Sequence, residues 1–289
     1  MLVSRVTATT ILFTLLAPFT AATPQQGQQQ QQQKHLKQQD PLSEAGQLHP
    51  LPPHHPSLAG IAEAQGPDFL SPPTTYEAMS SSVARTAPLV FPAAGKHTAT
   101  VIFAHGLGDT GHGWASAVEN WRRRQRLDEV KFVLPHAPQI PITCNWGMRM
   151  PGWFDIKVLD GTVEALRESE DERGILASSE YFQQLVQAEV DAGIPAERVV
   201  LGGFSQGGAM AIFSGLTGKH RIGGIVGLSC WLLLSNKFAG LVPAEKANQE
   251  TPVWLGHGDA DPLVRPELGA LSMDALKGLG YKVSRTLYP

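Results

Sequence analysis

The hydrophobic positions of the chain change their spacing repeatedly between about residue 79 and residue 289. Short runs of consecutive apolar residues, which are typical of strands buried on both faces, alternate with longer segments in which apolar residues recur at helical spacing. The short runs predict strands at residues 100–104, 130–134, 198–202, 223–228, 252–255 and 282–288. The longer segments predict helices at residues 114–126, 178–192, 206–216 and 266–279. This alternation predicts an α/β fold with a mainly parallel sheet and helices on both faces.

The first 78 residues lack this alternation. Residues 23–78 are rich in Gln, Pro and His, and such a composition buries too little apolar surface to offset the entropy of ordering, so it predicts a disordered linker. Residues 1–22 contain Arg5, an apolar stretch at 11–19 and then Ala21 and Ala22, which is the three-part pattern of a secretory signal. The stretch is too short to span a bilayer as a helix.

Met79 stands where the composition changes and is an alternative start of translation, so the folded domain is expected to be residues 79–289. A product that begins at Met79 is expected in the cytoplasm and also in the nucleus, whereas a product that begins at Met1 is expected to be secreted if the signal is real. Cys144 and Cys230 are too few for a disulfide framework and best fit a reducing compartment, with a single bridge between them as the alternative.

Composition restricts the possible partners. The 289 residues are 42% hydrophobic and 17% charged, which is enough apolar material for a proper core. The formal net charge of -3 gives no general electrostatic reason to expect nucleic acid or an anionic membrane surface as a partner. We expect no stable membrane span in the folded domain.

The sequence Gly203-Phe-Ser205-Gln-Gly207 matches G-x-S-x-G, the turn that presents a nucleophilic serine between a strand and a helix. The pattern alone is weak because 29 of the 289 residues are glycine. Here it directly follows the strand predicted at 198–202 and opens the helix predicted at 206–216, which is the required context. A glycine-rich turn with an incidental serine is the alternative. At a helix N-terminus, free N–H groups stabilise the negative charge of an oxyanion.

A second glycine-rich segment, His105-Gly-Leu-Gly-Asp-Thr-Gly-His112, follows the strand predicted at 100–104. Glycines in this position let backbone N–H groups approach a substrate oxygen, so the segment is a candidate second half of an oxyanion hole. His105, Asp109 and His112 also allow a metal-binding interpretation, but no further cluster supplies the ligands of a closed site. We therefore expect no metal and no cofactor.

The segment His257-Gly-Asp259-Ala-Asp261 follows the strand predicted at 252–255. A catalytic acid has to hold the tautomer of a histidine and stabilise its protonated form, and in this kind of fold it follows the serine along the chain. Asp259 and Asp261 both qualify by position. Capping of the following helix is the alternative for Asp259.

Together these strings resemble those of acyl-protein thioesterases, within the wider group of lysophospholipases and carboxylesterases of the α/β-hydrolase fold. The strings are HGLGDTGHGW, LGGFSQGGAM, LSCWL, HGDADPLV and the WFD segment at 153–155. The resemblance covers the chain from about Met79 to the end. It implies that Ser205 is the nucleophile and Asp261 the acid. It also implies that the backbone N–H groups of Leu107 and Gln206 form the oxyanion hole.

The resemblance also predicts a histidine after the last strand, but the last histidine of the sequence is His257, which precedes Asp261. Without a general base a serine hydroxyl is a weak nucleophile, and loss of one triad member costs on the order of 10⁴ to 10⁶ in turnover. The chain as printed is therefore expected to be nearly inactive. We interpret it as C-terminally incomplete, without the final histidine loop and helix of the fold.

The expected reaction of the complete enzyme is hydrolysis of fatty acyl thioesters on protein cysteines, that is, depalmitoylation, and its expected partners are S-acylated proteins and lipid acyl chains. The alternatives are a broad carboxylesterase or lysophospholipase, and a non-catalytic acyl-binding protein. An apolar, proline-punctuated segment at 140–154 is interpreted as a loop that covers an acyl-chain tunnel, with Met150, Trp153 and Phe154 as substrate-binding residues. Ordinary core packing is the alternative for these side chains.

Overall fold

The computed structural model describes residues 85–123, 127–158, 162 and 170–289. The signal-like segment at 1–22 and the linker at 23–78 lie outside these residues, as does the end of the helix predicted at 114–126. The other predicted strands and helices lie within the described residues and can be compared with the structure.

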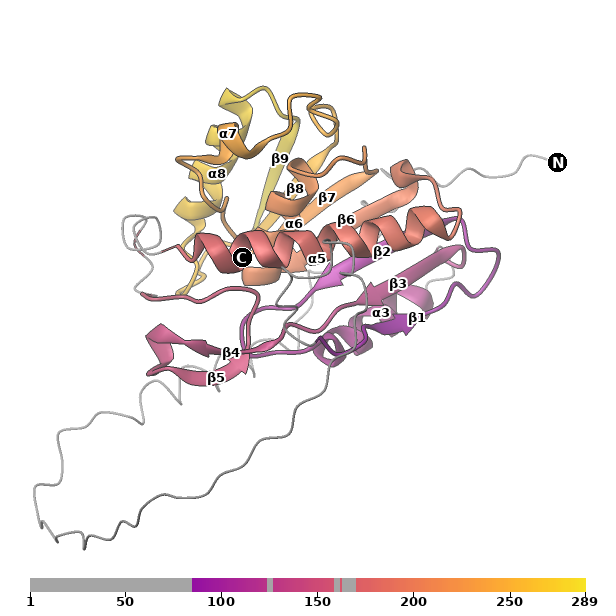
Figure 1. Cartoon of the computed structure of the whole chain (residues 1–289), viewed down its shortest axis with the longest axis horizontal. Coiled ribbons are helices and arrows are strands. Elements are labelled where there is room, and N and C mark those ends of the chain that lie inside the picture. Colours follow the sequence, from indigo (N-terminus) through magenta and orange to yellow (C-terminus); the bar gives the residue numbers. More distant parts are fainter. Residues whose placement is uncertain (1–84, 124–126, 159–161, 163–169) are drawn as a thin grey trace, which may run out of the picture. The chain divides into compact units, whose positions relative to one another are not determined.

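A seven-stranded sheet forms the centre of the domain, with the strand order β1-β3-β2-β6-β7-β8-β9 (Figure 1). β1 runs antiparallel to β3, and all other neighbours in this sheet are parallel. The prediction of a mainly parallel sheet is confirmed. The strands are β1 (Leu89–Phe91), β2 (Ala99–Ala104), β3 (Val130–Leu134), β6 (Val199–Phe204), β7 (Gly224–Leu228), β8 (Val253–Gly258) and β9 (Val283–Tyr288).

Helices cover both faces of the sheet, as expected. Along β2 and β6, side chains alternate between two hydrophobic cores: Ile102 and Leu201 belong to one, Val101 and Val200 to the other. The first core includes residues of α5 (Glu172–Asp191), α6 (Gln206–Leu216) and α8 (Pro266–Gly278), whereas the second includes residues of α3 (Ala115–Arg123). The short helix α7 (Phe238–Leu241) also contributes to the first core.

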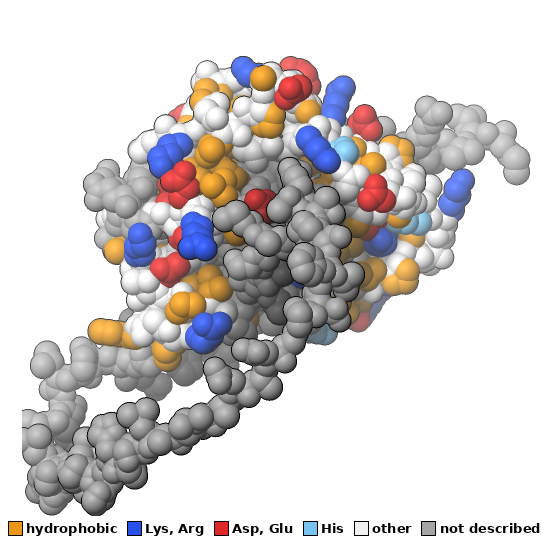
Figure 2. All heavy atoms as spheres, in the orientation of Figure 1, with side chains coloured by type: hydrophobic (Ala, Val, Ile, Leu, Met, Phe, Trp, Pro, Cys, Tyr) orange, Lys and Arg blue, Asp and Glu red, His pale blue; other side chains and the backbone are white. Residues whose placement is uncertain are grey.

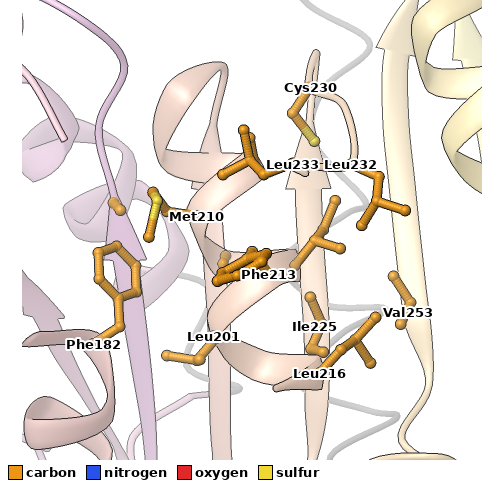
Figure 3. Close-up of a cluster of buried hydrophobic side chains, with 14 of the residues drawn as sticks. Phe182, Leu201, Met210, Phe213, Leu216, Ile225, Cys230, Leu232, Leu233 and Val253 are labelled. Carbon is orange, nitrogen blue, oxygen red and sulfur yellow. The ribbon is translucent and has the colours of Figure 1, made fainter. Parts of the chain in front are cut away.

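Helix α6 lies at the centre of the first core, and each of its residues is buried. Figure 3 shows its side chains Met210, Phe213 and Leu216 among residues of the neighbouring strands and of α5. A helix that is apolar all round is stable only inside a protein. The residue that precedes it, Ser205, is therefore attached to the most enclosed helix of the domain.

The segment predicted as a loop at 140–154 contains a hairpin instead. Strands β4 (Gln139–Ile142) and β5 (Met148–Pro151) pair antiparallel in a separate two-stranded sheet, which extends away from the main sheet in Figure 1. Pro141 suggested a loop because proline has no N–H to donate to a ladder, but an isolated two-stranded sheet tolerates it. The turn uses two positive φ angles, 56° at Trp146 and 71° at Gly147, and leaves Trp146 75% exposed.

The visible face of the domain carries basic and acidic side chains interspersed, without a continuous area of one sign on the described residues (Figure 2). This distribution agrees with the small net charge of -3. Within the described ranges, every helix is too short or too polar to cross a membrane.

Candidate active site

The three segments singled out from the sequence all begin at the carboxyl ends of strands in the main sheet. β2, β6 and β8 are part of a continuous parallel ladder, so the residues that follow their carboxyl ends meet at the same edge. These residues begin the segments at His105, Ser205 and Asp259. In open α/β sheets this edge is where ligands bind.

Ser205 occupies a sharp bend between β6 and α6. Its backbone has φ 52° and ψ -121°, an unfavourable conformation for a residue with a side chain. The bend is held from both sides, because the Ser205 amide donates to the Leu228 carbonyl at 2.8 Å and its carbonyl accepts from the Ala209 amide at 3.0 Å. The hydroxyl makes no capping hydrogen bond to α6. Ser205 is half-buried at the carboxyl ends of the strands, where these two backbone bonds fix the bend.

The two glycines of the motif are required by close packing of the backbone. A Cβ atom on Gly203 would lie 2.4 Å from the backbone of Gly207, and one on Gly207 would lie 2.4 Å from the carbonyl oxygens of Ala104 and His105. These distances are far below any van der Waals contact, and backbone atoms have little freedom to move aside. The G-x-S-x-G pattern therefore permits α6 to pack directly on the end of β2.

The segment after β2 lies beside the serine. A Cβ atom on Gly106 would be 3.3 Å from the Cβ of Ser205, so the next residue, Leu107, is close to this serine. Gly108 has φ 80° and donates its amide to the Pro151 carbonyl at 2.8 Å. Gln206 is the first residue of α6, and the N–H of a first helical residue has no acceptor within the helix. The structure thus brings together the two segments whose amides were predicted to form an oxyanion hole.

His105 is fully buried, and both of its ring nitrogens are engaged. Nε2 accepts from the Ala137 amide at 3.1 Å, so Nδ1 carries the proton and donates to the Gly106 carbonyl at 2.7 Å. Burial lowers the pKa of His105 to about 4, and the imidazole is neutral at neutral pH. Burial also raises the pKa of Asp109, whose carboxylate accepts from the Thr110 amide.

The metal-binding interpretation of His105, Asp109 and His112 has little support in this geometry, because neither nitrogen of His105 has a lone pair directed to an open site. Across residues 85–123, 127–158, 162 and 170–289, groups of three or more His, Cys, Asp or Glu side chains suited to a metal ion are absent. His112 instead lies with its ring 5.2 Å from the ring of His136.

The two candidate acids differ in their surroundings. Asp259 is exposed, whereas the side chain of Asp261 is only 6% exposed. Asp261 Oδ1 accepts from the amides of Leu263 and Val264, each at 3.0 Å. These bonds fix the carboxylate and stabilise its charge while Oδ2 keeps its acceptor capacity. Neither aspartate caps the following helix, because the residue at the N-cap of α8 is Arg265; Asp261 instead caps the turn at 262–264.

His257 lies near Asp261 but is committed elsewhere. Its Nε2 donates to the Val264 carbonyl at 2.7 Å and stands 3.9 Å from Asp261 Oδ2. Burial lowers the pKa of His257, which favours the neutral form. In the described part of the chain, none of the histidine side chains makes a hydrogen bond to Ser205 or to Asp261.

The three predicted substrate-binding side chains fall into two groups. Trp153 and Phe154 are each 2% exposed and belong to the first core, so the structure places them inside the protein. Met150 is half-buried on β5. An open cavity of about 630 Å³ lies elsewhere, beside Gly95 and Arg122, and its lining contains none of the predicted site residues.

One polar contact beside Ser205 was not predicted from the sequence. The side chain of Gln206 is fully buried, and its amide pairs with the backbone of residues 153 and 154. The sequence carried a signal for it: a polar residue at the start of an otherwise apolar buried helix needs a partner. It did not reveal that the partner would be the WFD segment, 52 residues earlier along the chain.

Comparisons with known proteins agree with this geometry. The family described as phospholipase/carboxylesterase matches residues 86–289. The chain is 65% identical to acyl-protein thioesterase 1 of Neurospora crassa over 209 residues, which cover 72% of this chain and 85% of that protein. It is 64% identical to acyl-protein thioesterase 1 of Gibberella zeae over 208 residues, 72% of this chain and 88% of the relative.

Solved structures are similar as well. Acyl-protein thioesterase 2 of Zea mays is 30% identical with a TM-score of 0.60, and the match covers 70% of this chain and 88% of that one. The SOBER1 protein of Arabidopsis thaliana is 30% identical with a TM-score of 0.61, over 66% of this chain and 89% of the other.

Proposed function

Because the chain belongs to the phospholipase/carboxylesterase family of α/β-hydrolases, we propose that it is a serine hydrolase that removes fatty acyl groups from S-acylated protein cysteines, with Ser205 as its nucleophile. The observation that carries the proposal is the positive φ of 52° at Ser205, held between two glycines that admit no side chain. Strain of this kind persists where the surrounding structure enforces it, which is common at active sites. The relatives named acyl-protein thioesterases support the choice of a thioester.

The proposed reaction is acyl transfer in two steps. The Ser205 hydroxyl attacks the thioester carbonyl, and its proton passes to an imidazole base. The resulting oxyanion accepts hydrogen bonds from the backbone N–H groups of Leu107 and Gln206. When the carbonyl re-forms, the carbon–sulfur bond breaks and the cysteine leaves as a thiolate, which needs little acid assistance because the thiol pKa is about 8.5. Water then attacks the acyl-serine and releases the fatty acid.

Asp261 is proposed as the acid that orients the base, because its carboxylate is buried and fixed by two amides while Oδ2 remains able to accept. The histidines of the described residues do not reach Ser205. We therefore expect the 289-residue polypeptide to turn over slowly and free imidazole in the buffer to accelerate it. Acceleration should require both Ser205 and an intact fold, so a Ser205→Ala variant should show none.

The decisive experiment is labelling with a fluorophosphonate in imidazole buffer, followed by a comparison of palmitoyl thioester and palmitoyl ester substrates. Labelling of wild type but not of Ser205→Ala, with faster turnover of the thioester, supports the proposal. Labelling with faster turnover of esters or lysophospholipids would make the chain a broad carboxylesterase or lysophospholipase instead. Acyl binding without any labelling would indicate a non-catalytic acyl-binding protein.

Of the three predicted acyl-binding residues, Met150 is partly exposed and can contact a substrate, because Trp153 and Phe154 are buried in the core. We propose that Met150 contacts the acyl chain and that the other two support the wall behind it. Met150→Ala should lower kcat/KM for palmitoyl more than for butyryl substrates, by about tenfold for a contact of roughly 1–2 kcal/mol. Equal effects on both substrates would remove Met150 from the acyl site.

The proposed substrates, S-acylated proteins, place the active product in the cytoplasm or the nucleus if it begins at Met79. This part of the proposal depends on residues outside those that the structure describes. Mass spectrometry of the N-terminus of the native protein tests it. A mature N-terminus near residue 23 in the secreted fraction would overturn it.

A further inference from the structure

The side chain of Gln206 makes contacts that the acyl-transfer steps do not use. Its Oε1 accepts from the Trp153 amide at 2.8 Å, and its Nε2 donates to the Phe154 carbonyl at 2.6 Å. The amide thus pairs with this irregular segment much as a neighbouring strand would, with one donor and one acceptor satisfied. Gln206 is 0% exposed, so these bonds form away from water, where losing them leaves unsatisfied polar groups.

The same segment is tied on its other side to the loop after β2. The Trp153 indole Nε1 donates to the His105 carbonyl at 2.8 Å, and the Pro151 carbonyl accepts from the Gly108 amide at 2.8 Å. These two bonds flank Leu107 along the chain. Residues 151–154 therefore connect the loop that carries one proposed oxyanion donor to the residue that carries the other.

The connection is rigid at its centre. Trp153 is 2% exposed, and its ring lies 5.1 Å from the rings of both His105 and Phe182. Its carbonyl accepts from the Ser178 hydroxyl on α5. The amide, the carbonyl and the indole of Trp153 thus each have a hydrogen-bond partner, and the surrounding core restricts changes of its rotamer.

We propose that the Gln206 side chain and the Trp153 indole act together as positioning residues that set the spacing of the two oxyanion donors. The inference rests on the proposed function, because it concerns the residues that hold the proposed oxyanion donors in place. A purely structural role for the same bonds would stabilise the fold without any effect specific to the transition state. Donor position matters because hydrogen bonds to an oxyanion lose strength steeply with misalignment, and a displacement of about 1 Å costs roughly 100-fold in rate.

The test replaces the side chain while keeping the backbone donor. Gln206→Met has similar size and retains the N–H of residue 206 but loses both side-chain bonds. Trp153→Phe keeps a ring in the core and loses only the bond to His105. Gln183→Met is the matched control, since Gln183 also bonds α6 through a side-chain amide, to the Ser214 carbonyl, but far along the helix from the loop.

Two readouts separate positioning from stability. One is turnover of a palmitoyl thioester in imidazole buffer. The other is affinity for an alkylboronic acid in the same buffer: its boron binds the serine oxygen, the hydroxyl proton passes to the buffer, and the anionic tetrahedral adduct mimics the oxyanion. Gln206→Met and Trp153→Phe should each lower kcat and boronate affinity about 10- to 100-fold while KM changes less than about threefold. The Gln183→Met control should alter both by less than about twofold.

The double variant sharpens the test. If Gln206 and Trp153 act through one connection, the pair should lose little more than either single variant, because breaking the second bond of a broken link changes nothing further. Additive losses, or wild-type kcat and boronate affinity in Trp153→Phe, would overturn the inference. If Gln206→Met does not fold, Trp153→Phe still decides. Wild type that binds no boronate at Ser205 would instead defeat the proposed function.

Discussion

The two ends of the parallel sheet are held together by different chemistry. At the amino end, the buried Glu189 carboxylate contacts Lys131 Nζ at 2.5 Å and accepts from the Thr100 hydroxyl at 2.7 Å. Arg198, just before β6, pairs with Glu129 at 3.2 Å. At this end, charged groups link the strands to one another and to α5.

At the carboxyl end the fixed contacts beside the serine are neutral. Gln206 and Trp153 bond through amides and an indole, and His105 is an uncharged imidazole. The contrast between charged and neutral contacts is explained by the reaction that we propose at the carboxyl end. A permanent ion beside Ser205 would shift the energy of a negatively charged intermediate, whereas oriented neutral dipoles stabilise it without adding a charge to the empty site. The amino end carries no such reaction and tolerates buried ion pairs.

The largest effect should come from breaking the close backbone approach at the carboxyl end. Gly207→Ala would place a Cβ atom 2.4 Å from two backbone carbonyl oxygens. We expect a loss of at least about 4 kcal/mol in the free energy of unfolding, measured by urea denaturation, together with loss of labelling at Ser205. Gly278→Ala is the control, because nothing lies within 4 Å of its Cβ and alanine favours the helix by up to about 1 kcal/mol. Equal stability of the two variants would contradict the packing argument.

The next effect should come from the charged end. Glu189→Gln keeps the shape of the side chain but leaves Lys131 without its counter-charge, and we expect a loss of about 3 kcal/mol in unfolding free energy. The rate constant per folded molecule should stay within about twofold of wild type, since the site lies at the opposite end. Glu119→Gln, which removes an exposed pair with Arg123, should cost less than about 0.5 kcal/mol. A fall in kcat at full folding would show that the two ends are coupled.

A pH titration tests the neutral end. Unfolded histidine has a pKa near 6.5 and buried His105 a pKa of about 4, so between these values the unfolded chain binds more protons. Stability should therefore be complete above about pH 6.5 and fall as the pH drops toward 4, by about 3 kcal/mol from this residue. Part of the fall should remain in His105→Gln, because the pKa values of His97, His136 and His257 are also lowered.

The control for that titration is Gln183→Met, which removes a side-chain hydrogen bond to the Ser214 carbonyl of α6 but no ionisable group. Its stability profile should run parallel to that of wild type, while the profile of His105→Gln should be flatter. Parallel profiles for all three proteins would mean that His105 is not held neutral by burial.

The smallest effect concerns backbone strain at Ser205. Glycine adopts φ near 52° without a steric penalty, so Ser205→Gly should be more stable than Ser205→Ala by about 1–2 kcal/mol, despite the greater flexibility of its unfolded chain. Thermal unfolding of the two variants measures this difference. A more stable Ser205→Ala would show that the bend is not strained.

Much of the fold could be read from local pattern. The strand predicted at 130–134 and the helix predicted at 206–216 have the observed bounds, and the other predicted sheet strands differ by a few residues. The hairpin of β4 and β5 was read as a loop, and β1 was not predicted. β1 has three residues and its partner, β3, lies farther along the chain, whereas β4 and β5 have four residues each and pair with each other. In strands this short, hydrophobic spacing carries little signal.

The sequence by itself determined the order of strands and helices and the turn at Ser205, because these depend on spacing and on glycines placed within a few residues of each other. Only the tertiary structure decided that Asp261 rather than Asp259 has the buried, anchored carboxylate, and that Gln206 reaches the backbone of Trp153. Burial and hydrogen-bond partners arise where segments distant along the chain meet. The local sequence pattern of a segment does not specify which distant segment it will contact in the folded structure.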